Sequence, residues 1–267
     1  KDGTLVYLYS TNPNDQYSYI QAAKDKGYNV LLFDGQLDIP LIGQFEQKFD
    51  KTRFVRVDSD TIGNIISKGD AQTVSISEEQ KTALQEVFKN QLPKIEKVDF
   101  IVSFEAMGAE ANPVMLTQSE YMRRMRDMAS IQPGMSFYGE MPDSYSLVLN
   151  TDHKLIKKTL EDEENVCSER LKPILDDLKG WKARQSDLRD ARNKKKQDEI
   201  TEAEKEDFAA TNNKVDELVQ QRNRIFADYA KDNKLVSQLI DLALLSNGML
   251  KGESLSRFIR RSAEMID

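Results

Sequence analysis

The stretch that decides the fold is Leu239-Ile-Asp-Leu-Ala-Leu-Leu-Ser-Asn-Gly-Met-Leu-Lys-Gly-Glu-Ser-Leu-Ser-Arg-Phe-Ile-Arg-Arg261, close to the end of the chain. With the residues just before it, this stretch predicts two short amphipathic helices, over 235–245 and 252–261, hinged at Asn247-Gly248. Gly248 suits the left-handed conformation that ends a helix. Because two helices this apolar cannot bury both faces on each other, we expect the tail to need a partner surface. The apolar side chains expected to meet that surface are Leu235, Leu239, Leu242, Leu245, Leu250, Leu255, Phe258 and Ile259.

The composition sets the broad class of the protein. A length of 267 residues favours at least two units. No apolar run approaches the roughly 18–20 residues that span a bilayer. There is neither a basic-then-apolar leader nor an initiator Met, so we expect a cytoplasmic piece of a longer protein. The net charge of −7 argues against nucleic acid as the main partner. Cys167 and His153 are the only residues of their types, which excludes an internal disulfide and a zinc site built from them.

Residues 1–75 alternate between strand and helix patterns. Strands are predicted over 5–9, 29–33 and 53–57, with helices between them, and this order implies a small parallel α/β/α unit. A ligand site in such a unit would lie at the carboxyl ends of the strands, where Asp34-Gly35 stands. The chain has no Gly-x-Gly-x-x-Gly and no Gly-Lys-Ser/Thr loop to hold a phosphate, so we favour a structural role. Asp38 is expected to cap a helix.

Residues 76–267 predict a mixed α+β domain. Ser77 and Gln80 form a capping box for a helix over 78–91, and strands are expected over 98–104 and 144–149 with a loop at 108–113. Thr151 or Asp152 should cap a helix that runs to Leu160. His153 has no positioned nucleophile or orienting group in the sequence, so we interpret it as part of a strand-to-helix turn. Cys167 is expected to be an inert thiol.

Residues 162–233 are densely charged, which indicates a stretch without a globular core of its own. Two apolar stripes of 3–4 spacing, over 171–188 and 208–229, predict an antiparallel coiled-coil hairpin inserted in the domain. Thr201 and Glu204 form a capping box at the start of its second arm. The lysines 194–196 at the tip are interpreted as a solvated end of the hairpin rather than an anion or membrane patch.

The helix expected over 119–129 carries an apolar stripe made of Tyr121, Met122, Met125 and Met128. Methionine is flexible and polarizable, and it suits surfaces that accept many apolar shapes. Arg123, Arg124, Arg126 and Asp127 are expected to face away from the stripe. The alternative is that the methionines face the domain's own sheet.

Several segments resemble HtpG, the bacterial form of the heat-shock-protein-90 chaperones. The resemblance rests on the tail, on Tyr28-Asn-Val-Leu-Leu-Phe33 and Leu37-Asp-Ile39, on the Asn112-Pro113 loop, and on Leu149-Asn-Thr-Asp-His153, where the family has proline in place of Thr151. It implies that 1–75 is the end of the middle domain and that 76–267 is the C-terminal dimerisation domain. The hairpin at 162–233 departs from the family's usual pattern, so no role is carried over to it.

The resemblance also implies a function. In this family the tail forms the homodimer interface, and the helix at 119–129 contacts unfolded client proteins in the dimer cleft. The family's ATP pocket and catalytic arginine loop lie upstream of this stretch, so we expect a part of a stress-response chaperone that does not itself hydrolyse ATP and holds no Mg-ATP or other cofactor. The alternative is a small doubly wound module that binds a nucleotide or another ligand and carries a coiled-coil tether.

Overall fold

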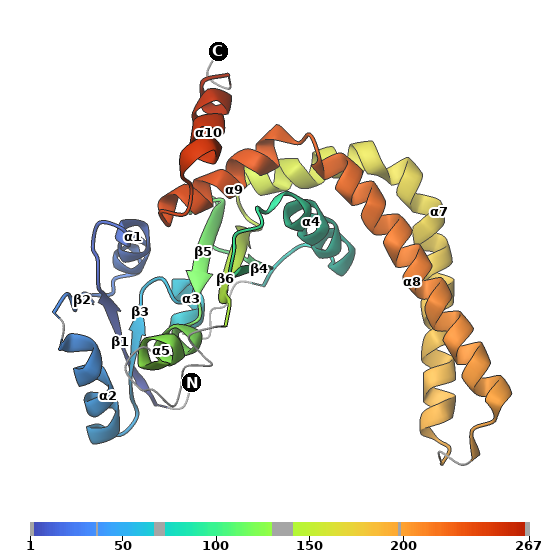
Figure 1. Cartoon of the computed structure of the whole chain (residues 1–267), viewed down its shortest axis with the longest axis horizontal. Helices are drawn as coiled ribbons and strands as arrows, with labels where there is room; N and C mark the ends of the chain where they lie inside the picture. Colours follow the sequence, from blue (N-terminus) through green and yellow to red (C-terminus); the bar gives the residue numbers. More distant parts are fainter. Residues whose placement is uncertain (1–2, 36, 67–72, 130–140, 197–198, 265–267) are drawn as a thin grey trace.

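The computed structural model describes residues 3–35, 37–66, 73–129, 141–196 and 199–264 (Figure 1). Its first sheet contains β1 (Leu5–Ser10), β2 (Val30–Leu32) and β3 (Thr52–Arg56) in the order β2-β1-β3. Both neighbours pair with β1 in parallel, which confirms the predicted order of strands and helices. The connecting helices are α1 (Tyr17–Asp25) and α2 (Asp38–Lys48), and the short α3 (Ile62–Ile65) follows β3.

The two faces of the first sheet are covered differently. On one face, Tyr9 and Phe54 pack with Ile42 of α2. On the other, Leu8 packs with α1, and the same cluster includes Met115 and Val148 from a second sheet. The apolar side of α1 therefore joins the first sheet to the rest of the chain.

The second sheet contains β4 (Val98–Glu105), β5 (Val114–Gln118) and β6 (Asp143–Asn150) in the order β4-β6-β5. The β4–β6 pair is parallel and the β5–β6 pair is antiparallel, so this sheet is mixed. The sequence did not predict β5, which follows the loop at 108–113. Helix α4 (Glu78–Gln91) begins at the predicted capping box of Ser77 and Gln80, and α5 (Glu120–Ala129) follows β5 directly.

The largest core, which we call the main core, lies on the face of the second sheet that α4 and the later helices cover. Its buried members include Val87 and Phe88 of α4, Leu116 of β5 and Leu147 of β6. Helix α9 (Lys234–Ser246) contributes Leu239 and four further residues to this core. The tail thus begins as part of the main core.

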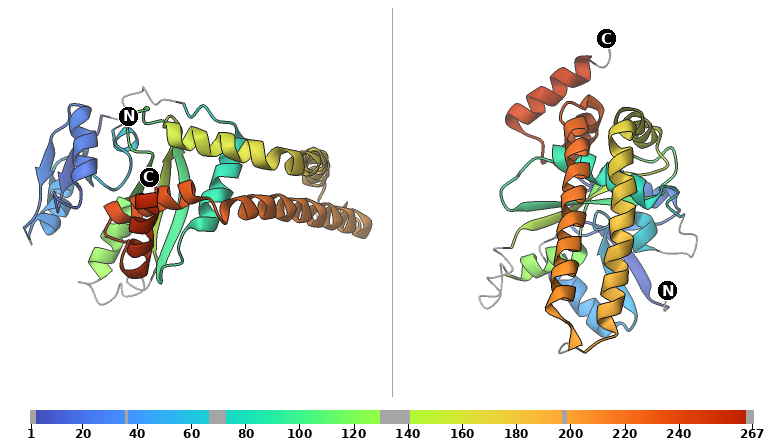
Figure 2. Two further views of the ribbon diagram at one scale, coloured as in Figure 1. Left: turned by 90° about the horizontal axis from the view of Figure 1, so that it is seen from above. Right: turned by 90° about the vertical axis from the view of Figure 1, so that its right-hand side faces the viewer.

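A helical hairpin extends from this core. Helix α7 (Lys154–Asn193) is one continuous helix of 40 residues, and α8 (Glu202–Ala230) returns beside it (Figures 1 and 2). The expected break between a helix ending at Leu160 and a separate arm was wrong. The N-cap of α7 is His153, whose Nδ1 accepts from the Leu155 N–H at 3.1 Å, rather than Thr151 or Asp152. The capping box of Thr201 and Glu204 is confirmed.

The base of the hairpin belongs to the main core, which the apolar stripes of the sequence did not predict. Cys167 and Leu171 of α7, with Ile225, Phe226 and Ala230 of α8, belong to the main core. A separate cluster of Leu178, Val215 and Leu218 lies further along the arms. The high charge of the whole segment concealed that the basal part of its apolar stripe packs against α4 and the second sheet. Only the outer part of the hairpin has a core confined to the two arms.

Helix α10 (Gly252–Glu264) ends the described chain and projects from α9 (Figure 1). Gly248 has a φ of 65°, which confirms its expected left-handed conformation after α9. Polar contacts join the two helices: Arg261 Nη2 lies 2.5 Å from Asp241 Oδ2, and Gln238 Nε2 lies 2.7 Å from Ser262 Oγ. Among the residues described, no helix combines the length and apolar character needed to cross a membrane.

Candidate functional site

The structure places the predicted apolar stripe on α5 at the protein surface. Tyr121 is 65% exposed, and Met122 and Met125 are half-buried. The side chain of Met128 lies outside the described residues. The exposed phenol ring of Tyr121 and the flanking methionines form what we call the α5 surface.

Arg123 and Arg124, which were predicted to face away from the apolar stripe, point toward the first sheet and α2 rather than into solvent. Arg123 is only 8% exposed, and its Nη2 donates to the hydroxyl of Tyr9 at 2.5 Å. Arg124 points to the first sheet as well, where its Nη1 lies 2.7 Å from Glu46 Oε2 and its Nη2 donates to the Phe54 carbonyl at 2.7 Å. The polar side of α5 therefore faces the first sheet and α2, where the Tyr9 hydroxyl, the Glu46 carboxylate and the Phe54 carbonyl provide partners for the two guanidinium groups.

Glu120 is the centre of these contacts. It is 7% exposed, and its Oε1 accepts from the Tyr9 hydroxyl at 2.9 Å, from Arg123 Nη2 at 2.8 Å and from Arg124 Nε at 2.7 Å. We call the five residues Tyr9, Glu46, Glu120, Arg123 and Arg124 the α5 latch. The latch contains two carboxylates and two guanidinium groups, so its charges balance.

The electrostatics follow from this arrangement. Burial by itself would raise the pKa of Glu120, but the two arginines outweigh it and hold that pKa below its usual value. Burial, reinforced by the negative charge of Glu120, raises the pKa of Tyr9 to about 12. At neutral pH the Glu120 carboxylate is therefore ionised beside the two arginines, and the phenol of Tyr9 is neutral.

Sequence reasoning missed the latch. The spacing of Glu120, Arg123 and Arg124 is a local signal, since residues three and four apart on a helix are neighbours. Tyr9 and Glu46 lie on distant segments, and no pattern in the sequence links them to α5.

The tail residues predicted to meet a partner divide into two groups. Leu239, Leu250 and Phe258 are buried in the chain's own core, and Leu235 and Leu255 pack partly against it. Leu242, Leu245 and Ile259 are 39%, 40% and 58% exposed. We call these three residues the tail surface, because they are the residues of the predicted interface that remain exposed in this chain.

At the carboxyl end of the first sheet, polar groups of the loops form hydrogen bonds with other groups of the same chain. Gln16 is 5% exposed, and its Oε1 accepts from Ser10 Oγ at 2.8 Å and from the Thr11 N–H at 3.0 Å just beyond β1. Asp38 Oδ2 accepts from the Gly35 N–H at 2.8 Å, so it closes the turn before α2, where we had expected a helix cap. These contacts favour a structural role for both loops. In the described residues, no three His, Cys, Asp or Glu side chains gather as a metal site.

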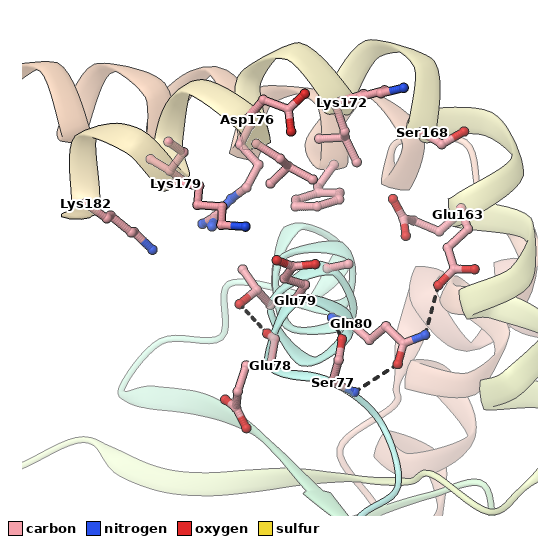
Figure 3. A pocket seen from close by; sticks show the side chains of 18 residues that line it. Ser77, Glu78, Glu79, Gln80, Glu163, Ser168, Lys172, Asp176, Lys179 and Lys182 are labelled. Carbon is pink, nitrogen blue, oxygen red and sulfur yellow. Dashed lines mark hydrogen bonds between the residues drawn. The ribbon is translucent and has the colours of Figure 1, made fainter.

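A cavity of about 920 Å³ lies between the start of α4 and the base of the hairpin (Figure 3). Lys179 and Lys182 lie toward one end of it and Glu163 toward the other. Glu163 is 3% exposed, and its Oε1 has no hydrogen-bond partner in the described part of the chain. Burial raises the pKa of Glu163 to about 7 and that of the neighbouring Cys167 to about 11, so the thiol is neutral and buried, as an inert cysteine would be.

No family model matches the chain. Curated relatives named chaperone protein HtpG match it along its whole length: the protein of Bacteroides thetaiotaomicron is 52% identical over 266 residues, and that of Bacteroides fragilis is 53% identical over 266 residues. The protein of Porphyromonas gingivalis is 48% identical over 268 residues. The chain spans 39% of the length of each of these relatives. It belongs to the HtpG family of chaperone proteins.

Proposed function

We propose that this chain supplies the dimerisation and client-binding parts of an HtpG chaperone. In this proposal residues 1–75 are the end of the middle domain, and 76–267 are the C-terminal dimerisation domain with a coiled-coil hairpin at 162–233. The tail joins two copies of the chain, and the α5 surface contacts unfolded or partly folded clients. ATP hydrolysis belongs to the part of the relatives that this chain does not span, and the assembly acts in the cytoplasm.

The observation that carries the client-binding proposal is the orientation of α5. Its polar side is held against the first sheet, and Tyr121 is 65% exposed on the helix. An exposed aromatic ring beside flexible methionines suits weak binding to apolar segments of many sequences. Such a surface has no need of a preformed pocket, because an unfolded chain can adapt its shape to it.

The test replaces the α5 surface by serine in the triple variant Tyr121→Ser, Met122→Ser and Met125→Ser. Complete burial of a Met side chain stabilises by about 1.5–3 kcal/mol, so losing two half-buried ones should leave a domain of ordinary stability folded. Light scattering from a chemically denatured test protein should show weaker suppression of aggregation. Val166→Ser is the matched control, because Val166 is 62% exposed on α7, away from α5. Unchanged suppression by the triple variant would contradict the proposal.

A further inference from the structure

We propose that Arg124 and its partners Glu46 and Glu120 are positioning residues that fix the α5 surface relative to the first sheet. Through them the orientation of the client-binding helix follows the position of the first sheet. The part of this inference that concerns clients rests on the proposed function. The mechanical coupling between α5 and the first sheet stands on the geometry of the latch.

The first argument is that α5 has few other attachments. It is joined covalently to β5 at its start, and within the described residues it shares no extensive packing with any other helix or strand. Its contacts to distant segments include the polar ones of the latch. A helix held in this way depends on a small number of side chains for its orientation.

The second argument is that Arg124 reaches three separate elements. Its Nε lies 2.7 Å from Glu120 on α5, its Nη1 lies 2.7 Å from Glu46 on α2, and its Nη2 donates to the Phe54 carbonyl on β3. Glu46 Oε1 also accepts from the Phe54 N–H at 2.7 Å, which fixes the carboxylate against the sheet. The planar guanidinium group can satisfy these directions together, which the single ammonium group of lysine cannot.

The third argument is that the charges are buried as a matched set. Glu120 and Arg123 are almost inaccessible, and the side chains of Arg124 and Glu46 are 27% and 22% exposed. Removing one member leaves an opposite charge without its partner in a region of low polarity, which strongly disfavours the closed arrangement. The latch is therefore suited to hold one orientation firmly and to release it when one contact is lost.

The junction between the two sheets also has an apolar part, where α1 packs with Met115 and Val148. This part adjoins the second sheet directly, and its described members include no residue of α5. Loss of the latch should consequently free α5 while the contact between the sheets remains. This separation makes the proposal testable.

The experiment compares backbone hydrogen exchange in Arg124→Met, Glu46→Gln and the unaltered chain. We expect amides of α5 to exchange at least tenfold faster in both variants, while amides of β1 and β6 keep their rates. Arg170→Met is the matched control, because Arg170 forms an exposed ion pair with Asp228 on the hairpin, at 3.0 Å. This control should leave α5 unchanged. Arg124→Lys keeps the positive charge but lacks the branched guanidinium group, so it should loosen α5 to a smaller extent than Arg124→Met.

Two results would overturn the proposal. One is unchanged exchange of α5 in Arg124→Met and Glu46→Gln. The other is loss of protection in β1 and β6 together with α5 in Arg124→Met, Glu46→Gln and Arg124→Lys, which would make the latch a requirement of the whole fold. Suppression of aggregation separates this proposal from the function it rests on. A loosened α5 with full suppression leaves the positioning role intact and shows that client binding does not require a fixed α5, while the triple serine variant tests the client-binding role by itself.

Discussion

The side-chain amide of Asn247 donates to the hydroxyl of Tyr19 at 3.2 Å and so joins residues 228 positions apart. The same Tyr19 hydroxyl donates to the Leu116 carbonyl on β5. One buried phenol thus connects α1, the second sheet and the end of α9. Burial raises the pKa of Tyr19 to about 12, so the hydroxyl remains a neutral donor across the physiological range.

Replacing Tyr19 by Phe should therefore destabilise the fold. The Leu116 carbonyl would lose a buried partner, which costs about 1–3 kcal/mol, whereas the half-buried Asn247 amide would keep its bond to the Ala243 carbonyl at 2.9 Å. Urea unfolding should show a lower midpoint with an unchanged slope. Tyr17→Phe is the control, because Tyr17 is 63% exposed on the same helix, and it should leave the midpoint unchanged. Equal midpoints for the two variants would show that the Tyr19 contacts contribute nothing to stability.

The tail surface should control association between copies of the chain. Leu242→Asp combined with Ile259→Asp places charge on exposed positions, so the fold should persist while an apolar interface could no longer close. Sedimentation should show a monomer whose circular-dichroism spectrum matches that of the unaltered chain. A variant that still sediments as a dimer at micromolar concentration would exclude the tail surface as the interface.

Phe258→Asp should behave differently from the exposed pair. Phe258 is 9% exposed and belongs to the main core, so the new carboxylate would lie among apolar side chains of the same chain. We expect a lower melting temperature whether or not the chain is associated. Circular dichroism during heating measures this effect, and an unchanged melting temperature would contradict the assignment of Phe258 to the core.

The fold should tolerate removal of the outer part of the hairpin but not removal of its base. A short Gly/Ser bridge in place of 183–210 keeps Leu178, Val215 and Leu218, so the melting temperature should change little. Deleting 165–231 removes Leu171, Ile225 and Phe226 from the main core, and each large side chain lost there costs about 2–5 kcal/mol. The longer deletion should fail to fold in a thermal scan. Equal melting of the two deletions would show that the base contributes nothing to the core.

Glu163 should make stability fall as pH rises. Its pKa is about 7 in the folded chain, above the ordinary value of 4.5, so the folded state binds the proton more tightly than the unfolded state does. The stabilising effect of the proton is complete below about pH 4.5 and is lost as pH rises through about 7. Glu163→Gln should be more stable than the unaltered chain at pH 8, by up to about 3 kcal/mol, and the difference should shrink at pH 5. Urea unfolding at both pH values measures it, and a difference independent of pH would rule out Glu163 as the source.

Local rules predicted the parts of the fold that depend on neighbouring residues. The capping boxes at Ser77 and Thr201, the left-handed Gly248 and the alternation of strands and helices along residues 1–75 all follow from short-range patterns. Strand β5 was not predicted from the sequence. Its five residues follow Pro113 directly, and their burial comes from pairing with β6, which is distant in the sequence.

The candidate site shows the same division. The stripe of Tyr121, Met122 and Met125 could be predicted from helical spacing, and Tyr121 is exposed in the structure. The partners of Arg123 and Arg124 could not, because Tyr9 and Glu46 approach them only after the first sheet has formed and docked. Periodicity identifies which side chains share a face of a helix, but the environment of each face is decided by the tertiary structure.

The uninterrupted course of α7, with α8 beside it, determines how such an arm can vary in length. An insertion at the tip lengthens both helices, and the seam stays in phase when each gains seven residues, which is close to two full turns. Each such step extends the reach by about 10 Å, since a residue adds about 1.5 Å. Intermediate insertions would swing the tip around the axis of the arm. We therefore expect the arms of related chains to differ in length by whole heptads, with seven residues added to each helix. Evolution could then alter how far the arm reaches while its base stays the same.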